Sequence, residues 1–406
     1  MIGDEITGLS SCLYPFMESC EGIMMKILFC FLAFLFCATS SMAADTTRYY
    51  RYDEINGPLK SASSGLAGDG IRVLTSIPGV KGDDFLRKMK AFIDSESRWD
   101  APKGYTLDQV TFTNFKAELL HKDGAQSRKA VLLLHGGAYL IQLSNMYRDM
   151  AVRYSKMTDN ADVLMPDYRI APKYVFPSAL EDALEAWNWL LAKGYKPEDI
   201  LVVGDSAGGN LTLALTLKLR DMGKKLPGAI VCMSPWTDMA GSGKSHVEKM
   251  TVDPLFGNTP EYLPPKDGVM PEVLPFILSY VGKTDLKNPY LSPAYAKYDK
   301  FPPMLIQVGT EEVLESDSEL VYQSAVRAGV DATLTRYYGM FHVFQILGDV
   351  APESREAWNE VNSFIAQKFL HAKPEVLKQL PAPTFVIRPG NESVRILNES
   401  DYGIQK

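Results

Sequence analysis

Short apolar runs alternate with longer amphipathic segments through much of the chain. Each run is flanked by glycine, proline or polar residues and is typical of a strand buried on both faces. The first predicted strands of this pattern are Ala130–Leu134, Asp162–Met165, Ile200–Val203 and Ala229–Met233. Pro177–Ala192 has apolar residues at helical spacing and stops before Gly194. Strands that alternate with helices predict a mainly parallel sheet in an α/β fold.

The alternation breaks between residues 239 and 288, where glycine, proline and methionine are frequent, as expected of an insertion. It then resumes with two strands and two helices, in the order Pro303–Val308, Asp317–Ala328, Ala332–Tyr338 and Glu353–Ala372. Upstream, Gln109–Leu120 has strand character, whereas residues 45–105 contain one predicted helix, Asp83–Ser97, and do not indicate a part of the sheet. We therefore expect one α/β domain over residues 106–372. Residues 373–406 form a C-terminal extension without an assigned role.

The N-terminal region has the pattern of an export signal. Lys26 precedes the apolar run Ile27–Cys37, which is too short to span a bilayer comfortably, and small residues follow it. We expect residues 24–43 to be a signal peptide that is cleaved after Ala43. A transmembrane anchor and a lipoprotein are weaker alternatives, the latter because bulky Phe36 precedes the cysteine. The expected location is therefore periplasmic or extracellular, without a stable membrane anchor after cleavage.

Residues 1–23 are polar and mixed, unlike any part of an export signal. This composition predicts that translation starts at Met24 or Met25 and that residues 1–23 are a non-native upstream extension. Of the five cysteines, Cys232 alone follows the predicted cleavage site, so no intrachain disulfide is expected in the mature protein. Cys232 follows an apolar run and is expected to be a small buried residue.

Composition excludes several classes of function. The chain has 406 residues, 46% of them hydrophobic, which is enough to bury a large core. A net charge of −7 and the absence of a Lys/Arg cluster argue against a nucleic-acid partner. The five histidines are scattered without ligand spacing, so we expect no metal site.

Ser206 lies in Gly204-Asp-Ser-Ala-Gly208, between the predicted strand that begins at Ile200 and the amphipathic run Asn210–Arg220. This arrangement predicts a nucleophile elbow, a strained turn at which only small neighbours avoid a clash. The amides at the start of the following helix would favour the negative charge that an attacked carbonyl develops. The competing interpretation is an ordinary strand-to-helix turn.

A nucleophilic serine needs a base and an acid that orients the base. His342 follows the last predicted strand and is the candidate base; the alternative is a packed histidine among aromatic residues. Glu312 is the candidate acid, with Glu311 and Asp317 as alternatives. Ser316 and Glu319 predict a capping box, which would place Asp317 in the first turn of a helix. Serine, acid and histidine then occur in the order found in α/β hydrolases.

Two glycines and an alanine follow the predicted strand Ala130–Leu134 and open a candidate oxyanion hole at Gly136, Gly137 and Ala138. Small residues there let backbone N–H groups approach a substrate oxygen, and Ala207, the residue after the serine, would supply another N–H. A plain glycine turn is the alternative.

Six motifs in this order resemble the hormone-sensitive-lipase-like branch of the α/β-hydrolase family over about residues 110–370. They are His135-Gly-Gly-Ala138, Asp167-Tyr-Arg-Ile-Ala-Pro172, Phe176-Pro-Ser-Ala-Leu-Glu-Asp-Ala183, Gly204-Asp-Ser-Ala-Gly-Gly209, Ser234-Pro-Trp-Thr-Asp238 and Gly339-Met-Phe-His342. The resemblance implies an eight-stranded, mostly parallel sheet and a carboxylic-ester hydrolase that needs no cofactor. It also implies a helical cap formed by residues 45–105 and by the insertion at 239–288.

The resemblance assigns Ser206 as nucleophile, His342 as base and Glu312 as acid. It makes Gly137, Ala138 and Ala207 the oxyanion donors, with Gly136 shaping the turn. Two positions depart from the family pattern: Ala138 stands where a third glycine is usual, and Glu312 where aspartate is more common. The resemblance also implies structural roles, which hold loops by hydrogen bonds, for His135, Asp205, Tyr168 and Arg169.

Together these features predict an exported serine carboxylesterase that hydrolyses short-chain acyl esters through an acyl-enzyme. Its partner would be a small-molecule ester. The alternatives are a ligand-binding, non-catalytic homologue and a peptidase or amidase that uses the same triad. The length of the acyl chain, the alcohol and the oligomeric state are not encoded in these motifs.

Overall fold

The computed structural model describes residues 48–50, 60–76, 82–257 and 276–381. The expected signal peptide at residues 24–43 and the upstream residues 1–23 lie outside the described residues, as do 258–275 of the insertion and 382–406 of the C-terminal extension. In the described part of the C-terminal extension there is one short helix, α12 (Pro374–Leu377).

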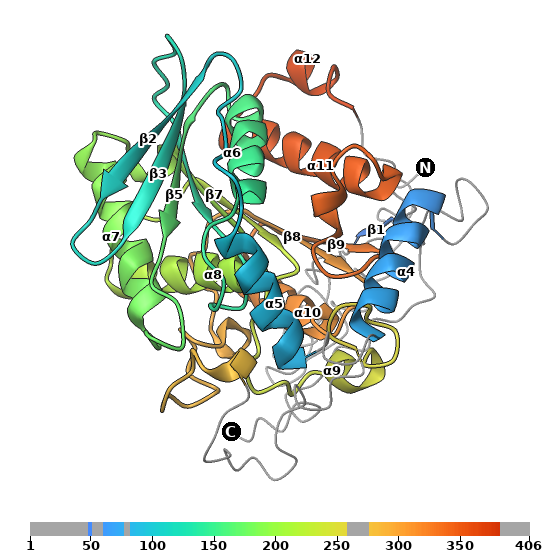
Figure 1. The fold of residues 1–406 in the computed structure, drawn as a ribbon. Helices are drawn as coiled ribbons and strands as arrows, with labels where there is room; N and C mark the ends of the chain where they lie inside the picture. Colours follow the sequence, from blue (N-terminus) through green and yellow to red (C-terminus); the bar gives the residue numbers. More distant parts are fainter. Residues whose placement is uncertain (1–47, 51–59, 77–81, 258–275, 382–406) are drawn as a thin grey trace, which may run out of the picture. The chain divides into compact units, whose positions relative to one another are not determined.

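Nine strands form one sheet among the described residues, in the order β1-β9-β8-β7-β6-β4-β5-β3-β2 (Figure 1). Their bounds are β1 (Arg48–Tyr50), β2 (Tyr105–Thr111), β3 (Lys116–Lys122), β4 (Ala130–Leu134), β5 (Asp162–Asp167), β6 (Ile200–Asp205), β7 (Ala229–Met233), β8 (Met304–Gly309) and β9 (Ala332–Tyr337). All neighbouring pairs are parallel except β2–β3 and β3–β5. The expected eight-stranded, mostly parallel sheet is therefore confirmed as β2 to β9.

The ninth strand corrects the prediction that residues 45–105 contribute nothing to the sheet. Arg48–Tyr50 pairs in parallel with Thr335–Tyr337 of β9. The outer edge of β9 would otherwise present unpaired backbone groups, and β1 satisfies them over a short distance. A strand of three residues is too short for a hydrophobic period, so sequence reasoning had no pattern to detect.

The predicted single run Gln109–Leu120 is also wrong, because it is divided between two antiparallel strands, β2 and β3. The chain turns between them where the N–H of Phe112 donates to the carbonyl of Phe115. Both strands alternate with the same period of two, so the periodicity continues across the turn and conceals it.

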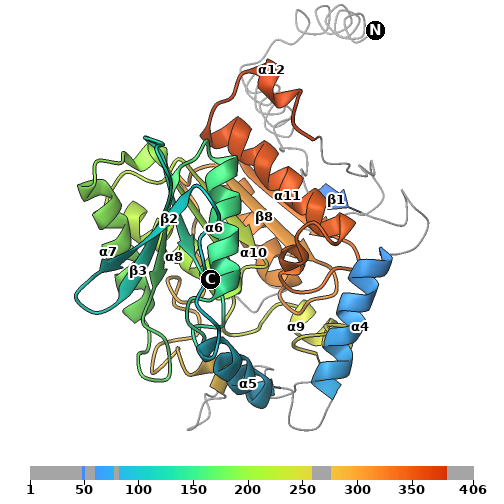
Figure 2. The ribbon, with the colours of Figure 1, turned by 45° about the horizontal axis from the view of Figure 1, so that its top comes forward.

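Helices cover both faces of the sheet (Figures 1 and 2). One face packs against α7 (Ser178–Ala192), α8 (Ser206–Asp221) and α10 (Glu315–Arg327), and the other against α6 (Asn145–Met157) and α11 (Pro352–Phe364). Successive side chains of β4 point to opposite faces of the sheet. Leu132 and Leu134 belong to the apolar cluster that includes α7 and α8. Val131 and Leu133 belong to the cluster that includes α6 and α11. This double burial explains the all-apolar strands.

Most predicted helices are present with shifted ends. The helix expected at Asp83–Ser97 is α5 (Gly82–Asp94). The last helix, expected at Glu353–Ala372, ends its regular part at Phe364 and continues as a π-helical turn, Ile365–Phe369. The predicted capping box is wrong: α10 starts at Glu315, and no side chain caps it. Ser316 Oγ instead forms a hydrogen bond with Ser245 Oγ.

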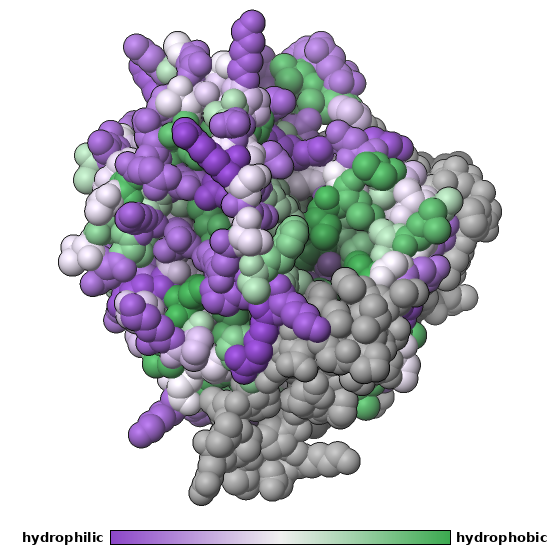
Figure 3. All heavy atoms as spheres, in the orientation of Figure 1, coloured by the Kyte–Doolittle hydropathy of each residue, from purple (hydrophilic) through white to green (hydrophobic). Residues whose placement is uncertain are grey.

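Helix α4 (Ala62–Ser76), which the sequence reasoning did not find, is fixed to the core by buried hydrogen bonds. Ser61 and Ser64 donate their hydroxyls to Glu353 at the start of α11. Ala67 and Ile71 pack against a cluster that contains Phe341, next to His342. Apolar side chains also gather at the surface beside α4 (Figure 3). Leu66, in α4 itself, is 75% exposed.

Cys232 is free and fully buried in β7, as its apolar surroundings predicted. Within the described ranges, no helix combines the length and the apolar character needed to cross a membrane.

Candidate active site

Ser206 lies at a sharp turn between β6 and α8. Its φ angle is +51°, in the left-handed region that non-glycine residues rarely adopt. A Cβ on Gly204 would lie 2.3 Å from the carbonyl oxygen of Gly208, and a Cβ on Gly208 would lie 1.9 Å from that of Leu134. Both glycines are therefore required sterically, which is the reason that the small-residue pattern indicated an elbow.

His342 and Glu312 form a buried pair. His342 Nδ1 lies 2.8 Å from Glu312 Oε2, and the two residues are 5% and 0% exposed. Glu312 follows β8 and His342 follows β9, so neighbouring parallel strands bring the two loops to the same edge of the sheet. The other carboxylate oxygen of Glu312 accepts hydrogen bonds from the Ser234 hydroxyl and from the Gly309 N–H. The carboxylate is thus held in place on both oxygens.

The surroundings of His342 favour its protonated form. Burial by itself lowers the pKa of the imidazole, but the hydrogen bond and charge of Glu312, with the charges of Asp253 and Asp205, raise it above its ordinary value. Because a carboxylate accepts only, Nδ1 carries the proton toward Glu312. Nε2 is then the nitrogen left to take a proton from a nucleophile.

The alternative acids have other partners. Glu311 binds Lys60 and Arg72 at 2.9 and 3.1 Å. Asp317 lies in the first turn of α10, as expected, but its carboxylate binds His246 at 2.7 Å. Glu312 is therefore the carboxylate that orients His342.

Among the described residues, no hydrogen bond joins Ser206 Oγ to His342. Catalytic hydrogen bonds are often long or poorly aligned in unliganded enzymes and tighten when substrate binds. The two residues lie at the same edge of the sheet, since both follow the carboxyl ends of parallel strands. Asp205, next to Ser206, is close enough for its charge to act on His342.

Three backbone N–H groups near Ser206 are available to a substrate oxygen. Ala207 lies in the first turn of α8, where backbone N–H groups have no partner within the helix. The N–H groups of Gly137 and Ala138 have no acceptor among the described residues. Gly137 and Ala138 adopt φ angles of +110° and +54°, which bend the loop back on itself. The three N–H groups predicted as oxyanion donors are thus available, and their role in binding a substrate oxygen stays a prediction.

Gly136 shapes the loop but offers no donor to a substrate. Its N–H donates to the Tyr147 hydroxyl at 2.7 Å, and that hydroxyl donates to Asp205 at 3.0 Å. A Cβ on Gly136 would lie 2.4 Å from Asp205 Oδ2, so a glycine is needed. Burial raises the pKa of Asp205 to about 6. Gly136 therefore belongs to the oxyanion loop as the residue that shapes its turn, which is the role that the resemblance implied.

The other expected structural residues hold loops together. The ring of His135 stacks on Tyr168, with 4.1 Å between ring centroids, and the Tyr168 hydroxyl donates to the His135 carbonyl. Arg169 binds the buried carboxylate of Asp182 through two nitrogens. These contacts fix the loops after β4 and β5 around the elbow.

Comparisons with known proteins agree with this geometry. A family model described as "alpha/beta hydrolase fold" matches residues 131–346. The chain belongs to the α/β-hydrolase fold family. It is 34% identical to an acetyl-hydrolase of Streptomyces hygroscopicus over 258 residues, which are 64% of this chain and 82% of that protein.

Two solved structures are similar to this hydrolase at 32% identity. One is EstE5 soaked with p-nitrophenyl butyrate (TM-score 0.66), and the other is an esterase from the bacterial hormone-sensitive lipase family (TM-score 0.65). Each match covers 76% of this chain and 99% of the solved chain. The resemblance to the hormone-sensitive-lipase-like branch is thereby confirmed.

Sequence reasoning missed two residues that support the hydrolase site. Ser234 donates to Glu312 and accepts the N–H of Val343, so it joins the two loops of the pair. Its position directly after a buried strand was a usable signal. Asp253 accepts the N–H of Val313 and acts on His342 by its charge. It lies in the insertion, where no periodicity pointed to it.

A small cavity of about 50 Å³ opens beside Ser206. Most of its wall is apolar: Ala138, Trp236, Met239, Met250, Phe256, Ile277, Leu278, Val313 and Leu314. Two polar side chains, Asp238 and His246, also line it. His342 is not among the described residues of this wall, although Phe256 packs edge-on against its ring.

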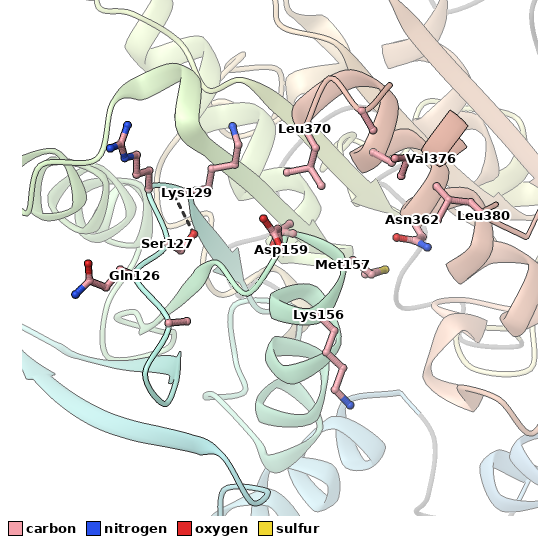
Figure 4. Close-up of a pocket in the computed structure, with 15 residues that line it drawn as sticks. Gln126, Ser127, Lys129, Lys156, Met157, Asp159, Asn362, Leu370, Val376 and Leu380 are labelled. Atoms are coloured by element: carbon pink, nitrogen blue, oxygen red, sulfur yellow. Dashed lines mark hydrogen bonds between the residues drawn. The ribbon is translucent and has the colours of Figure 1, made fainter. Parts of the chain in front are cut away.

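A larger hollow of about 770 Å³ lies at the other end of the sheet (Figure 4). Lys129, just before β4, and Leu370 and Val376 near the C-terminus contribute to its wall. The hydrolase elbow follows the opposite, carboxyl end of the parallel strands, and none of the triad candidates lines this hollow. Size alone therefore does not identify the reactive site.

Proposed function

We propose that this carboxylic-ester hydrolase cleaves short-chain acyl esters through an acyl-enzyme on Ser206. The observation that supports this most strongly is the buried 2.8 Å pair of His342 and Glu312 at the same sheet edge as the strained elbow. A histidine held by a carboxylate at the same sheet edge as a serine on a strained turn is the arrangement that activates a serine.

In the first half of the reaction, Ser206 Oγ attacks the ester carbonyl carbon and its proton moves to His342 Nε2. The negative charge on the former carbonyl oxygen is accepted by the N–H groups of Gly137, Ala138 and Ala207. When the carbon–oxygen bond to the alcohol breaks, His342 returns the proton to the leaving alkoxide. Each oxyanion donor is worth roughly 3 kcal/mol of transition-state stabilisation.

In the second half, water attacks the acyl carbon and gives a proton to His342. The bond between the acyl carbon and Ser206 Oγ then breaks, and the proton passes from His342 to the serine. Glu312 remains ionised throughout and stabilises the imidazolium that forms twice per cycle. The products are the carboxylic acid and the free enzyme.

Short acyl chains are favoured by the small cavity beside Ser206, of about 50 Å³, and by the methyl group of Ala138 in its wall. The names of relatives are consistent with this: one is an acetyl-hydrolase, and a similar structure was soaked with a butyrate ester. A cavity of this size leaves little room for a long fatty chain.

The test is the hydrolysis of p-nitrophenyl esters from acetate to dodecanoate. We expect kcat/KM to be highest for the short esters and Ser206→Ala to lose activity by about 10⁴-fold or more. Ser155→Ala is the matched control, since Ser155 is also buried and its hydroxyl has no hydrogen-bond partner among the described residues. Equal rates for wild type and Ser206→Ala would exclude the mechanism. If the protein hydrolysed p-nitroanilides and none of the esters, its activity would instead be that of an amidase.

A further inference from the structure

A second buried histidine–carboxylate pair lies at the same cavity and has no part in the proposed mechanism. His246 Nε2 is 2.7 Å from Asp317 Oδ1, and the two residues are 6% and 0% exposed. His246 lies in α9 (Ser245–Glu248), within the insertion, and Asp317 lies in α10. His246 also lines the cavity beside Ser206.

The carboxylate fixes which nitrogen of His246 is free. Asp317 Oδ2 accepts the backbone N–H groups of Thr237 and Asp238, both at 2.8 Å, so the carboxylate is held in position. Because Asp317 accepts only, Nε2 of His246 carries the proton between them. Nδ1 has no hydrogen-bond partner among the described residues. It is also not one of their fully buried polar atoms without a partner, so it is accessible. Nδ1 is therefore the polar atom that His246 offers to the cavity.

We infer that the cavity lies on the acyl side of the scissile bond. Ser206 and Ala138 of the oxyanion loop line it, whereas His342 does not. The base must protonate the departing alcohol, so the alcohol lies next to His342. The part of the substrate that fills the cavity is consequently the acyl chain, and it meets a mostly apolar wall with one imidazole nitrogen.

A metal site is the competing interpretation, because ligand atoms of Asp238, His246 and Asp317 all lie within 4.8 Å of one another. The hydrogen bonds oppose it. Both oxygens of Asp238 already accept donors, namely the N–H groups of Ala240 and Ser242 and the hydroxyls of Ser242 and Tyr295. Asp317 is likewise occupied on both oxygens. A cation would have to displace these donors. The carboxylate of Asp317 therefore positions the His246 imidazole, and the three residues do not form a metal site.

We propose that His246 is a specificity residue that recognises a hydroxyl group on the acyl chain; this rests on the proposed esterase function. A hydroxyl can donate to Nδ1 when the imidazole is neutral and accept from it when the imidazole is protonated. A methyl group in the same place can do neither and leaves a polar nitrogen unpaired in an apolar cavity, which costs affinity in the transition state. The substrate class is therefore an ester of a short hydroxy acid.

The test compares p-nitrophenyl esters in which a hydroxyl replaces a methyl group of the same size. The pairs are 2-hydroxybutyrate with 2-methylbutyrate, and 3-hydroxybutyrate with 3-methylbutyrate. We expect wild type to prefer the hydroxy ester of at least one pair by about 10- to 100-fold in kcat/KM, after correction for the rates with hydroxide alone. In His246→Phe the preference falls to about one, because the hydroxy ester loses its hydrogen-bond partner and therefore loses more activity than the methyl ester.

The controls separate specificity from folding. His121→Phe, at the half-buried histidine of β3, leaves the preference unchanged. A parallel loss for both esters in His246→Phe would mean a purely structural pair and overturn the proposal, as would a wild type without any preference. A wild type without any preference overturns the proposal even if His246→Phe does not fold.

Two further results are distinguishable. If wild type hydrolyses none of the esters, butyrate included, the esterase function itself fails. If it hydrolyses butyrate but ignores the hydroxyl, only the role of His246 fails. A preference that disappears with a chelator and returns with a divalent metal would assign the cluster to a cation and overturn the proposal.

Discussion

Lys60 Nζ lies 2.9 Å from Glu311 Oε2, one residue before the carboxylate that binds His342. Arg72, from α4, binds the same Glu311 oxygen and the carbonyl of Val252. Lys60 also donates to the carbonyl of Gly339, in the loop that leads to His342. The segment around α4 therefore holds both loops of the Glu312–His342 pair.

Because Lys60 and Arg72 bind Glu311, a substitution outside the active site should affect catalysis. Lys60→Met should lower kcat by about 3- to 10-fold with little change in KM, because it loosens loops that orient the base without touching substrate. Steady-state kinetics with p-nitrophenyl butyrate measure this. Lys129→Met is the matched control, since Lys129 likewise binds one carboxylate, of Asp199, and one carbonyl, of Phe369, but at the other end of the sheet. Equal kcat values for both variants and wild type would remove α4 from the positioning of the pair.

Replacing the acids should separate their roles. Glu312→Gln should lower kcat by about 10³- to 10⁴-fold, because an amide no longer holds the imidazole in the right tautomer or stabilises its charge. Asp317→Asn should lower kcat for butyrate far less, since Asp317 acts on His246. Circular dichroism spectra of both variants control for folding. The reverse order of losses would move the acid to Asp317.

The raised pKa of His342 predicts the pH profile. The base works when neutral, so kcat/KM should rise with pH through the pKa of the free enzyme, with a midpoint above the ordinary value of 6.5. Asp253→Asn removes one of the carboxylates that raise this pKa, so its midpoint should move to lower pH. A midpoint that moves upward would contradict the electrostatic account.

Ala138→Gly tests the departure from the family pattern. Ala138 has a φ of +54°, which glycine adopts without the steric cost of a Cβ, so the variant should gain up to about 1 kcal/mol in stability. Removing the methyl group also enlarges the cavity beside Ser206, so the preferred acyl chain should lengthen by one or two carbons. Thermal unfolding and the ester series measure the two effects. A lower melting temperature would show that the loop needs the alanine.

Local pattern was sufficient where local sterics decide the structure. The elbow at Ser206 was predictable because backbone atoms leave no room for a Cβ at Gly204 and Gly208. The buried strands were predictable because both faces of the sheet are covered, which makes them apolar throughout. The order of serine, acid and histidine then follows from successive strand ends in a parallel sheet.

Tertiary contacts decided the rest. Glu311 and Glu312 are adjacent and chemically alike, yet one binds Lys60 and the other His342, because successive side chains of a loop point in different directions. The hydroxyl of Tyr147 accepts the N–H of Gly136, so this N–H cannot bind a substrate oxygen. His246 reaches the cavity from an insertion whose sequence has no hydrophobic periodicity. The sequence by itself thus determined the fold family and the strained turn at Ser206 through spacing and steric need. The choice of acid, the free amides and the polar wall of the acyl cavity depend on contacts between residues far apart in the chain, and only the folded structure brings them together.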